Sequence, residues 1–173
     1  MKILNSNSRA FTMIETLVVI GIITLLSTTL IMYSRTGESQ IVLFKEQAKV
    51  VALLIKARSL SIITFGDSDI PCNYGVHFSS PDTVILFKEF SSECSNVNKI
   101  YDSSEEKIEE IKLDSAVKFG ELELADVVFI PPDPQVIIDG DPSKQSALVK
   151  IKTVDGSAEK TIKITNAGQI TTQ

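Results

Sequence analysis

The chain has 173 residues, which suits one domain with a modest core, and its formal net charge is −5. An acidic chain is a poor match to a polyanion, so the composition argues against nucleic acid as the main ligand.

The first notable feature is an uncharged stretch near the N-terminus. Between Arg9 and Arg35 the single charged residue is Glu15. The stretch is long enough to cross a bilayer, which takes about 20 helical residues. A charge inside such a stretch costs roughly 2.5–3.5 kcal/mol on insertion scales. Glu15 is therefore a candidate functional residue that needs a partner.

We expect residues 11–34 to be a membrane anchor that crosses the inner membrane once. A secretory signal would place small residues after the apolar run, and Tyr33-Ser34-Arg35 makes a poor cleavage site of that kind. Lys2 and Arg9 precede the run, so the positive-inside rule places the N-terminus in the cytoplasm. The rest of the chain is then expected in the periplasm or outside the cell.

Residues 10–15 read Ala-Phe-Thr-Met-Ile-Glu and follow a short basic leader. This pattern resembles the N-terminal signal of type IV pilins and type II secretion pseudopilins. The resemblance implies that a prepilin peptidase removes residues 1–10 by cutting between Ala10 and Phe11. It also implies N-methylation of Phe11. Ala10 stands where the family usually has Gly.

Such a cut would give Glu15 a partner. The new α-amine of Phe11 is a cation at neutral pH, and it lies four residues before Glu15 on the same helix face. The pair can form within one chain. In the family, the Glu is understood to meet the N-terminus of a neighbouring subunit, and we expect this assembly role for Glu15. The alternative is a carboxylate exposed to lipid headgroups.

Residues 35–66 are predicted to continue the helix as an amphipathic segment. Apolar residues recur at spacings of three and four. The positions with this spacing are Ile41, Phe44, Ala48, Val51, Ile55, Ser59 and Ile62, of which only Ser59 is polar. Lys45, Glu46, Lys49, Lys56 and Arg58 are expected to form the polar surface. Gly66-Asp67 and Pro71 favour an end near Phe65. The alternative is an anchor followed by an unrelated helix.

Residues 67–173 are predicted to form a β-rich head. Strand-like segments are short and are separated by turns. They cover residues 74–78, 84–90, 107–119, 125–130, 147–154, 160–165 and 169–172. Asp155-Gly156 between two of them is typical of a hairpin. One long helix followed by such strands predicts an α+β fold with an antiparallel sheet, as in pilins.

Cys72 and Cys94 both follow the anchor and therefore lie in an oxidising compartment, where thiols pair. We predict a disulfide between them, which would stabilise the head by about 3 kcal/mol in the chain-entropy model. The alternative is a metal site, but two cysteines and one histidine leave such a site short of ligands.

Asp133, Asp139 and Asp141 are weak candidates for a calcium site because oxygen ligands in a turn suit that ion. Asp139-Gly140-Asp141-Pro142 is equally typical of a plain turn. We otherwise expect no cofactor and no enzymatic activity. His77 alternates with Val76 and Phe78 and is interpreted as a strand residue.

Within the pilin-like class, residues 57–60, 74–78 and 167–170 resemble the H-type minor pseudopilin and its minor-pilin relatives. The resemblance implies a structural minor subunit of a secretion pseudopilus or type IV pilus. Its expected partners are other pilin subunits, prepilin peptidase, the inner-membrane assembly platform and lipid. The alternatives are a DNA-uptake minor pilin and an anchored protein, such as a binding module or a small hydrolase, that never assembles.

Overall fold

The computed structural model describes residues 11–63, 71–91, 93–131 and 135–173. The chain divides into two compact units, residues 1–38 and 39–173, and each unit is described by itself. One helix, α1 (Met13–Ile63), supplies residues to both. The predicted helix end near Phe65 and Gly66 falls outside the described residues.

In the first unit, α1 carries an apolar surface that no described residue covers. Residues Met13–Ile31 have a mean hydropathy of 2.1, and none of them is buried. This segment of 19 residues is long and apolar enough to cross a membrane. Threonine hydroxyls within it donate back to carbonyl oxygens one turn earlier, as from Thr28 to Thr24 at 2.8 Å, so their donors are satisfied without water.

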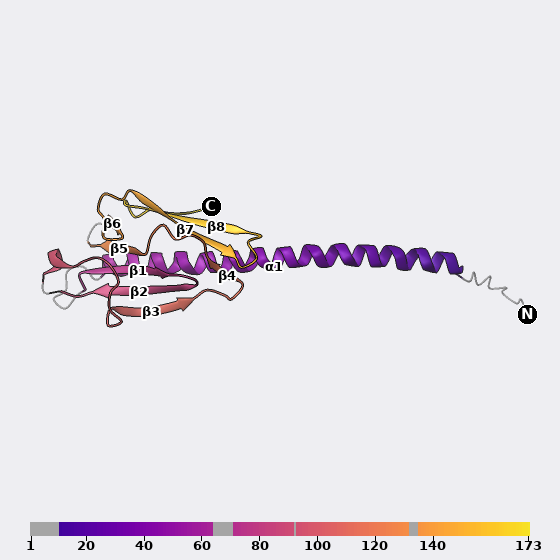
Figure 1. Ribbon diagram of the computed structural model, residues 1–173, viewed down its shortest axis with the longest axis horizontal. Coiled ribbons are helices and arrows are strands. Elements are labelled where there is room, and N and C mark those ends of the chain that lie inside the picture. The colour runs from indigo at the N-terminus through magenta and orange to yellow at the C-terminus, as the bar shows by residue number, and fades with distance from the viewer. Residues whose placement is uncertain (1–10, 64–70, 92, 132–134) are drawn as a thin grey trace, which may run out of the picture. The chain divides into compact units, whose positions relative to one another are not determined.

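The second unit contains two antiparallel sheets (Figure 1). The first sheet has five strands in the order β3-β2-β1-β5-β6. Their bounds are β1 Asn73–Ser79, β2 Thr83–Glu89, β3 Lys107–Lys112, β5 Asp126–Ile130 and β6 Gln135–Ile138. A short 3₁₀ turn, Cys94–Asn96, lies in the connection from β2 to β3.

The second sheet has four strands in the order β4-β7-β8-β9. Their bounds are β4 Val117–Phe119, β7 Ser146–Thr153, β8 Glu159–Thr165 and β9 Ile170–Thr172. The predicted hairpin at Asp155-Gly156 is the β7–β8 connection, where Gly156 adopts a φ of 74° that a residue with a side chain rarely adopts. The predicted α+β class is confirmed.

Two details of the sheets differ from the sequence prediction. The strand-like region 107–119 splits into β3 of the first sheet and β4 of the second. A turn separates them, in which the Val117 amide donates to the Asp114 carbonyl at 2.8 Å. In addition, β6 was not expected. It is four residues long, and it pairs with β5 from Val127↔Ile138 to Ile130↔Gln135.

The core lies between the inner faces of both sheets and the later part of α1. The helix contributes Leu43, Val50, Leu53, Leu54 and Ala57, all buried. The predicted apolar stripe is therefore not the packing face. Ile41 is 71% exposed and Phe44 is 65% exposed. This helix is apolar on two faces, and periodicity alone does not say which face meets the head.

Glu46 was expected at the surface and is instead fully buried. Both of its oxygens lie against the Lys49 ammonium, Oε1 at 2.7 Å and Oε2 at 2.9 Å, and this cation compensates the buried charge. The next residue, Gln47, donates from Nε2 to the Thr161 carbonyl at 3.2 Å. The Gln47 hydrogen bond thus joins α1 to β8, whereas the Glu46–Lys49 pair lies within the helix.

A disulfide joins Cys72 and Cys94, the pair expected from the sequence. Cys72 directly precedes β1, and Cys94 follows the end of β2. Since Asn73 pairs with Glu89 at that end of the β1–β2 hairpin, the bond closes the hairpin where its two strands would otherwise fray.

Candidate assembly site

The start of α1 forms a capping box. Thr12 precedes the first helical residue, and its hydroxyl accepts the Glu15 amide at 3.3 Å. The Glu15 carboxylate reaches back to the Thr12 amide at 3.4 Å and to the Thr12 hydroxyl at 3.5 Å. The pattern Thr-x-x-Glu satisfies two backbone donors that the first helical turn leaves without partners.

This geometry holds Glu15 at the positive end of the helix. A carboxylate in the first turn is stabilised there by the aligned peptide dipoles. Phe11, the expected first residue after cleavage, lies directly before the cap and is 78% exposed. The other predicted processing residue, Ala10, lies outside the described residues. The structure thus places the Glu15 carboxylate one residue from the position where cleavage would create an amine.

Thr12 was not among the residues expected to contribute to the site, although the Thr-x-x-Glu spacing before an apolar run is a recognisable helix-start signal. Its role is to orient the Glu15 carboxylate. This orientation is present in the chain before any cut, because the contacts involve only residues 12–15.

A second feature lies in the other unit, on the part of α1 that packs on the sheets. Opposite the buried face, an exposed stripe consists of Ile41, Phe44, Ala48, Ile55 and Ile62. The large side chains among these are between 47% and 71% exposed. An apolar stripe of this length on one helix face is typical of a surface that a partner covers.

The comparisons with known proteins concern the N-terminal segment. Residues 5–31 match the model of the prokaryotic N-terminal methylation motif. No curated protein and no solved structure matches the chain. The match is confined to this segment, which therefore carries a prepilin-type N-terminal methylation signal.

The aspartates considered as calcium ligands have other contacts. The Asp139 carboxylate accepts the amides of Ala125 at 2.6 Å and Asp126 at 2.9 Å, and its second oxygen lies 2.5 Å from Lys144 Nζ. Asp141 accepts both the amide and the hydroxyl of Ser143. Asp133 lies outside the described residues. Across the described ranges, no group of three or more His, Cys, Asp or Glu side chains has metal-binding geometry. The calcium hypothesis stays a prediction.

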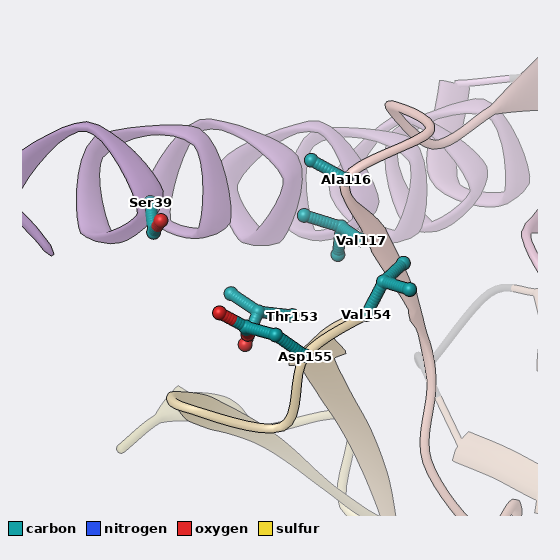
Figure 2. A pocket seen from close by; sticks show the side chains of 6 residues that line it. All are labelled: Ser39, Ala116, Val117, Thr153, Val154 and Asp155. Atoms are coloured by element: carbon teal, nitrogen blue, oxygen red, sulfur yellow. The ribbon is translucent and has the colours of Figure 1, made fainter. Parts of the chain in front are cut away.

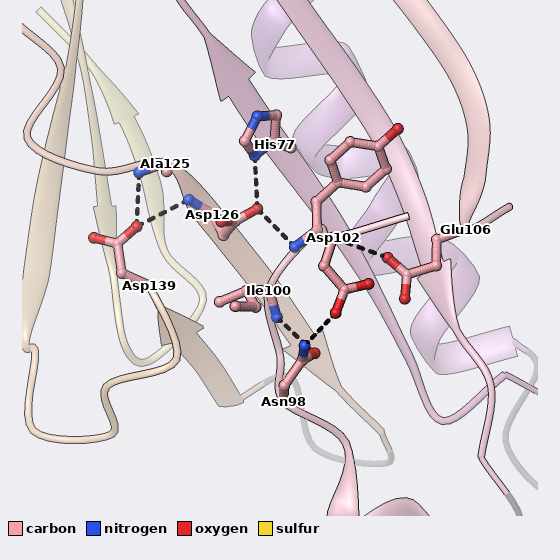
Figure 3. A network of polar contacts seen from close by, with 9 residues as sticks. His77, Asn98, Ile100, Asp102, Glu106, Ala125, Asp126 and Asp139 are labelled. Atoms are coloured by element: carbon pink, nitrogen blue, oxygen red, sulfur yellow. Dashed lines mark hydrogen bonds and ion pairs between the residues drawn. The ribbon is translucent and has the colours of Figure 1, made fainter. Parts of the chain in front are cut away.

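His77 lies in β1, as its alternation with Val76 and Phe78 predicts, and it belongs to a polar network (Figure 3). Its Nδ1 lies 2.9 Å from the Asp126 carboxylate, which is nearly buried and also accepts the Tyr101 amide at 3.2 Å. The Tyr101 ring lies 5.0 Å from the His77 ring. The network thus attaches the β2–β3 connection to the outer face of the five-stranded sheet.

We call residues 93–106 of this connection the strap. A second buried carboxylate also holds it, since Glu89 accepts the Lys99 amide at 2.9 Å with one oxygen and the Asn73 side chain at 2.6 Å with the other. Nothing in the sequence distinguishes Glu89 and Asp126 from surface carboxylates. Their function in the fold depends on loop atoms that lie ten or more residues away along the chain.

A pocket of about 300 Å³ opens between α1 and the β7–β8 turn (Figure 2). Its lining consists of Ser39, Ala116, Val117, Thr153, Val154 and Asp155. Hydrogen bonds from Thr153 and from Ser157 lower the pKa of Asp155 to about 2, so this side chain is a carboxylate at neutral pH. Ser39 and Thr153 are the other polar lining residues, and Ala116, Val117 and Val154 make the rest of the lining apolar.

Proposed function

We propose that this chain is a minor pilin or pseudopilin, a structural subunit that assembles through α1. In this proposal the apolar segment anchors the precursor in the inner membrane, with its N-terminus in the cytoplasm. Prepilin peptidase cuts between Ala10 and Phe11, and the new amine of Phe11 is methylated. The mature subunit then leaves the bilayer and packs into a helical filament.

The observation that carries the proposal is the match of residues 5–31 to the methylation motif, together with the position of Glu15. An isolated carboxylate in an apolar helix is costly unless it pairs. The capping box already directs it towards the start of the helix, where cleavage of the same chain or of a neighbour would supply a cation. Pairing with a neighbour would also set the axial register between subunits.

The two-faced character of α1 supports assembly independently of the motif. An extended apolar helix face is normally covered, either by the rest of the fold or by a partner. Here the face with Leu43 and Val50 is covered by the sheets, whereas Ile41 and Phe44 remain exposed in the isolated chain. Helices of neighbouring subunits would cover this second face, as expected for a filament built around its stems.

Within this class we propose the H-type minor pseudopilin as the subtype. The support is the order of short matching segments in the head, from residues 57–60 to residues 167–170. The assembly platform of the inner membrane would be a further partner. This assignment would fail if the chain were incorporated only into a retractable pilus and never into a secretion pseudopilus.

Processing provides the first test. Membranes from cells with and without prepilin peptidase are fractionated, and the N-terminus of the chain is determined by mass spectrometry. We expect a methylated Phe11 at the N-terminus with the peptidase and the intact leader without it. A chain that begins at Met1 in both preparations would contradict the proposal.

The second test concerns Glu15. The variant Glu15→Gln removes the charge but keeps the shape, and Glu38→Gln is the matched control on an exposed residue of the same helix. Both should be cleaved and remain in the membrane. We expect Glu15→Gln to reduce incorporation into sheared filaments by at least about tenfold, since an unpaired cation would remain in an apolar environment. Equal incorporation of the two variants would refute the role of Glu15.

A further inference from the structure

The four-stranded sheet carries a row of lysines on its outer face. Lys118 lies in β4, Lys150 and Lys152 in β7, and Lys163 in β8. Each alternates along its strand with buried residues, as Lys150 does between Val149 and Ile151. Side chains of a strand point alternately to its two faces, so all four point away from the core. We call these four residues the lysine face.

The register brings these charges together. Lys118 is directly opposite Lys152, which has Glu159 of β8 opposite it on its other side, and Lys163 is opposite Leu148, two residues before Lys150 in β7. With about 3.4 Å per residue and about 4.8 Å between strands, the four positions form a diagonal row across three neighbouring strands. Like charges opposite each other repel. No lysine of this face forms an ion pair with any residue of the described ranges.

The opposite charge gathers on the other sheet. The strap carries the carboxylates of Glu93, Asp102, Glu105 and Glu106 against one lysine, Lys99. The first three are exposed and Glu106 is half-buried. Burial raises the pKa of Glu106, and the nearby Asp102 carboxylate adds to this effect, as expected where negative charges crowd. Within the described residues, none of these four carboxylates has a cationic partner.

The strap is held in a fixed position on the outer face of its sheet. The Glu89 and Asp126 carboxylates accept its amides at Lys99 and Tyr101. The Tyr101 ring also packs on Phe87, with ring centroids 5.5 Å apart. The acidic groups are therefore presented by an ordered segment, which lowers the entropy cost of binding a partner.

We infer that the lysine face of one copy of this chain binds the strap of the next copy. The two surfaces are complementary in charge, belong to the same chain, and point away from a shared core, so one copy uses both at once. Such a contact joins unlike surfaces and repeats from copy to copy, which produces a ring if the rotation between copies closes and an open helical array if it does not. The inference rests on the proposed function and specifies how the heads would contact each other.

The test uses two charge-reversal variants of the full chain in detergent. Lys150→Glu/Lys152→Glu changes the lysine face, and Asp102→Lys/Glu105→Lys changes the strap. The matched control is Lys45→Glu/Lys112→Glu, which reverses two exposed lysines outside both surfaces. Sedimentation velocity measures self-association at about 20 mM and about 500 mM salt, because screening at high salt weakens contacts between exposed charges.

We expect the native chain and the control to associate at low salt and to dissociate at high salt. Each reversal variant alone should associate at least about tenfold more weakly, and an equimolar mixture of the two should recover association. Circular dichroism and thermal unfolding verify the fold of each variant. If Lys150→Glu/Lys152→Glu fails to fold, Lys150→Gln/Lys152→Gln replaces it. This neutral variant is also expected to weaken self-association.

Several results would overturn the inference. They are a native chain that does not associate at low salt, association that neither salt nor reversal changes, and a mixture of folded variants that does not recover. Duplex DNA is added in a separate arm. Retention of DNA by the lysine face without self-association would assign that face to nucleic acid instead. Normal cleavage and Glu15-dependent incorporation, combined with any of these results, would leave the proposed function intact.

Discussion

At the scale of single residues, carboxylates in this protein act mainly as acceptors for backbone amides. Glu15 accepts at the start of α1, and Glu89 and Asp126 accept from the strap. Asp139 accepts from the amides that begin β5. Asp139 was predicted to be a possible metal ligand, because an aspartate in a turn can either bind a metal or accept hydrogen bonds from backbone amides. Only the position of Lys144 and of the β5 amides distinguishes them.

Asp139 gives a prediction for the dependence of stability on pH. Burial would raise the pKa of its carboxyl, but the hydrogen bonds from Lys144 and from the amides of Asp126 and Ala125 outweigh it, and the pKa lies below its ordinary value. The folded state therefore holds the carboxylate more strongly than the unfolded state does. The resulting stability is present above about pH 4 and is lost as the pH falls through the lowered pKa.

The measurement compares urea unfolding of the native chain with Asp139→Asn at pH 7, 5 and 3. We expect the variant to be less stable by about 1–2 kcal/mol at pH 7 and pH 5, because charged hydrogen bonds are lost. The difference should shrink at pH 3. A gap that stays constant over this range would show that Asp139 does not contribute through its charge.

At the scale of elements, α1 shows both the strength and the limit of sequence patterns. Its existence and approximate length follow from an apolar run and a continued period of three and four. Its orientation on the head does not follow, because the segment Val50-Val51-Ala52-Leu53-Leu54-Ile55 offers apolar residues on every side. The sheets select one side, and the burial of Glu46 follows from that selection.

The strands show a related limit. The β7–β8 hairpin was predictable, since its turn residues and alternation are local in sequence. The assignment of β3 and β4 to different sheets was not, because β3 pairs with β2 and β4 pairs with β7, more than 30 residues away. Local alternation identifies a strand but carries no information on a distant pairing partner.

Two neighbouring residues of α1 separate stability from assembly. Leu43 is fully buried in the core, and Phe44 is 65% exposed on the outer stripe. We expect Leu43→Ala to lower the free energy of unfolding by about 2–5 kcal/mol, since it leaves a cavity. Phe44→Ala should change it by less than about 0.5 kcal/mol. Urea unfolding in detergent measures both values.

For incorporation into filaments, we expect Phe44→Ala to have a larger effect than its small effect on stability would suggest. Phe44→Ala keeps a folded head but removes apolar surface that neighbouring stems would cover, so its incorporation should fall. A Phe44→Ala chain that enters filaments as well as the native chain would assign the stripe no role in assembly. A large loss of stability in Phe44→Ala would show instead that the head itself needs this side chain.

At the scale of the whole molecule, the contacts divide the chain just before Ser39, and the entire described core belongs to the second unit. The first unit buries none of its apolar residues Met13–Ile31 within the chain. The two units therefore depend on different environments. Residues 39–173 contain their own apolar core, whereas the apolar residues Met13–Ile31 are not buried by any described part of the chain.

This division predicts how the chain responds to truncation. A chain that begins at Ser39 keeps every core residue, including Leu43, Val50 and Leu54 from α1, together with the disulfide. We expect it to remain monomeric without detergent and to unfold cooperatively on heating. A chain that begins after Ile63 loses the helix and uncovers the inner faces of both sheets, so it should aggregate.

Thermal unfolding followed by circular dichroism and light scattering distinguishes these outcomes. The decisive comparison is between the chain that starts at Ser39 and the full chain in detergent, whose head should unfold at the same temperature because no core residue precedes Leu43. A markedly lower unfolding temperature for the shorter chain would mean that residues before Ser39 stabilise the head. The anchor would then be part of the folded domain, and the separation of membrane insertion from head folding would not hold.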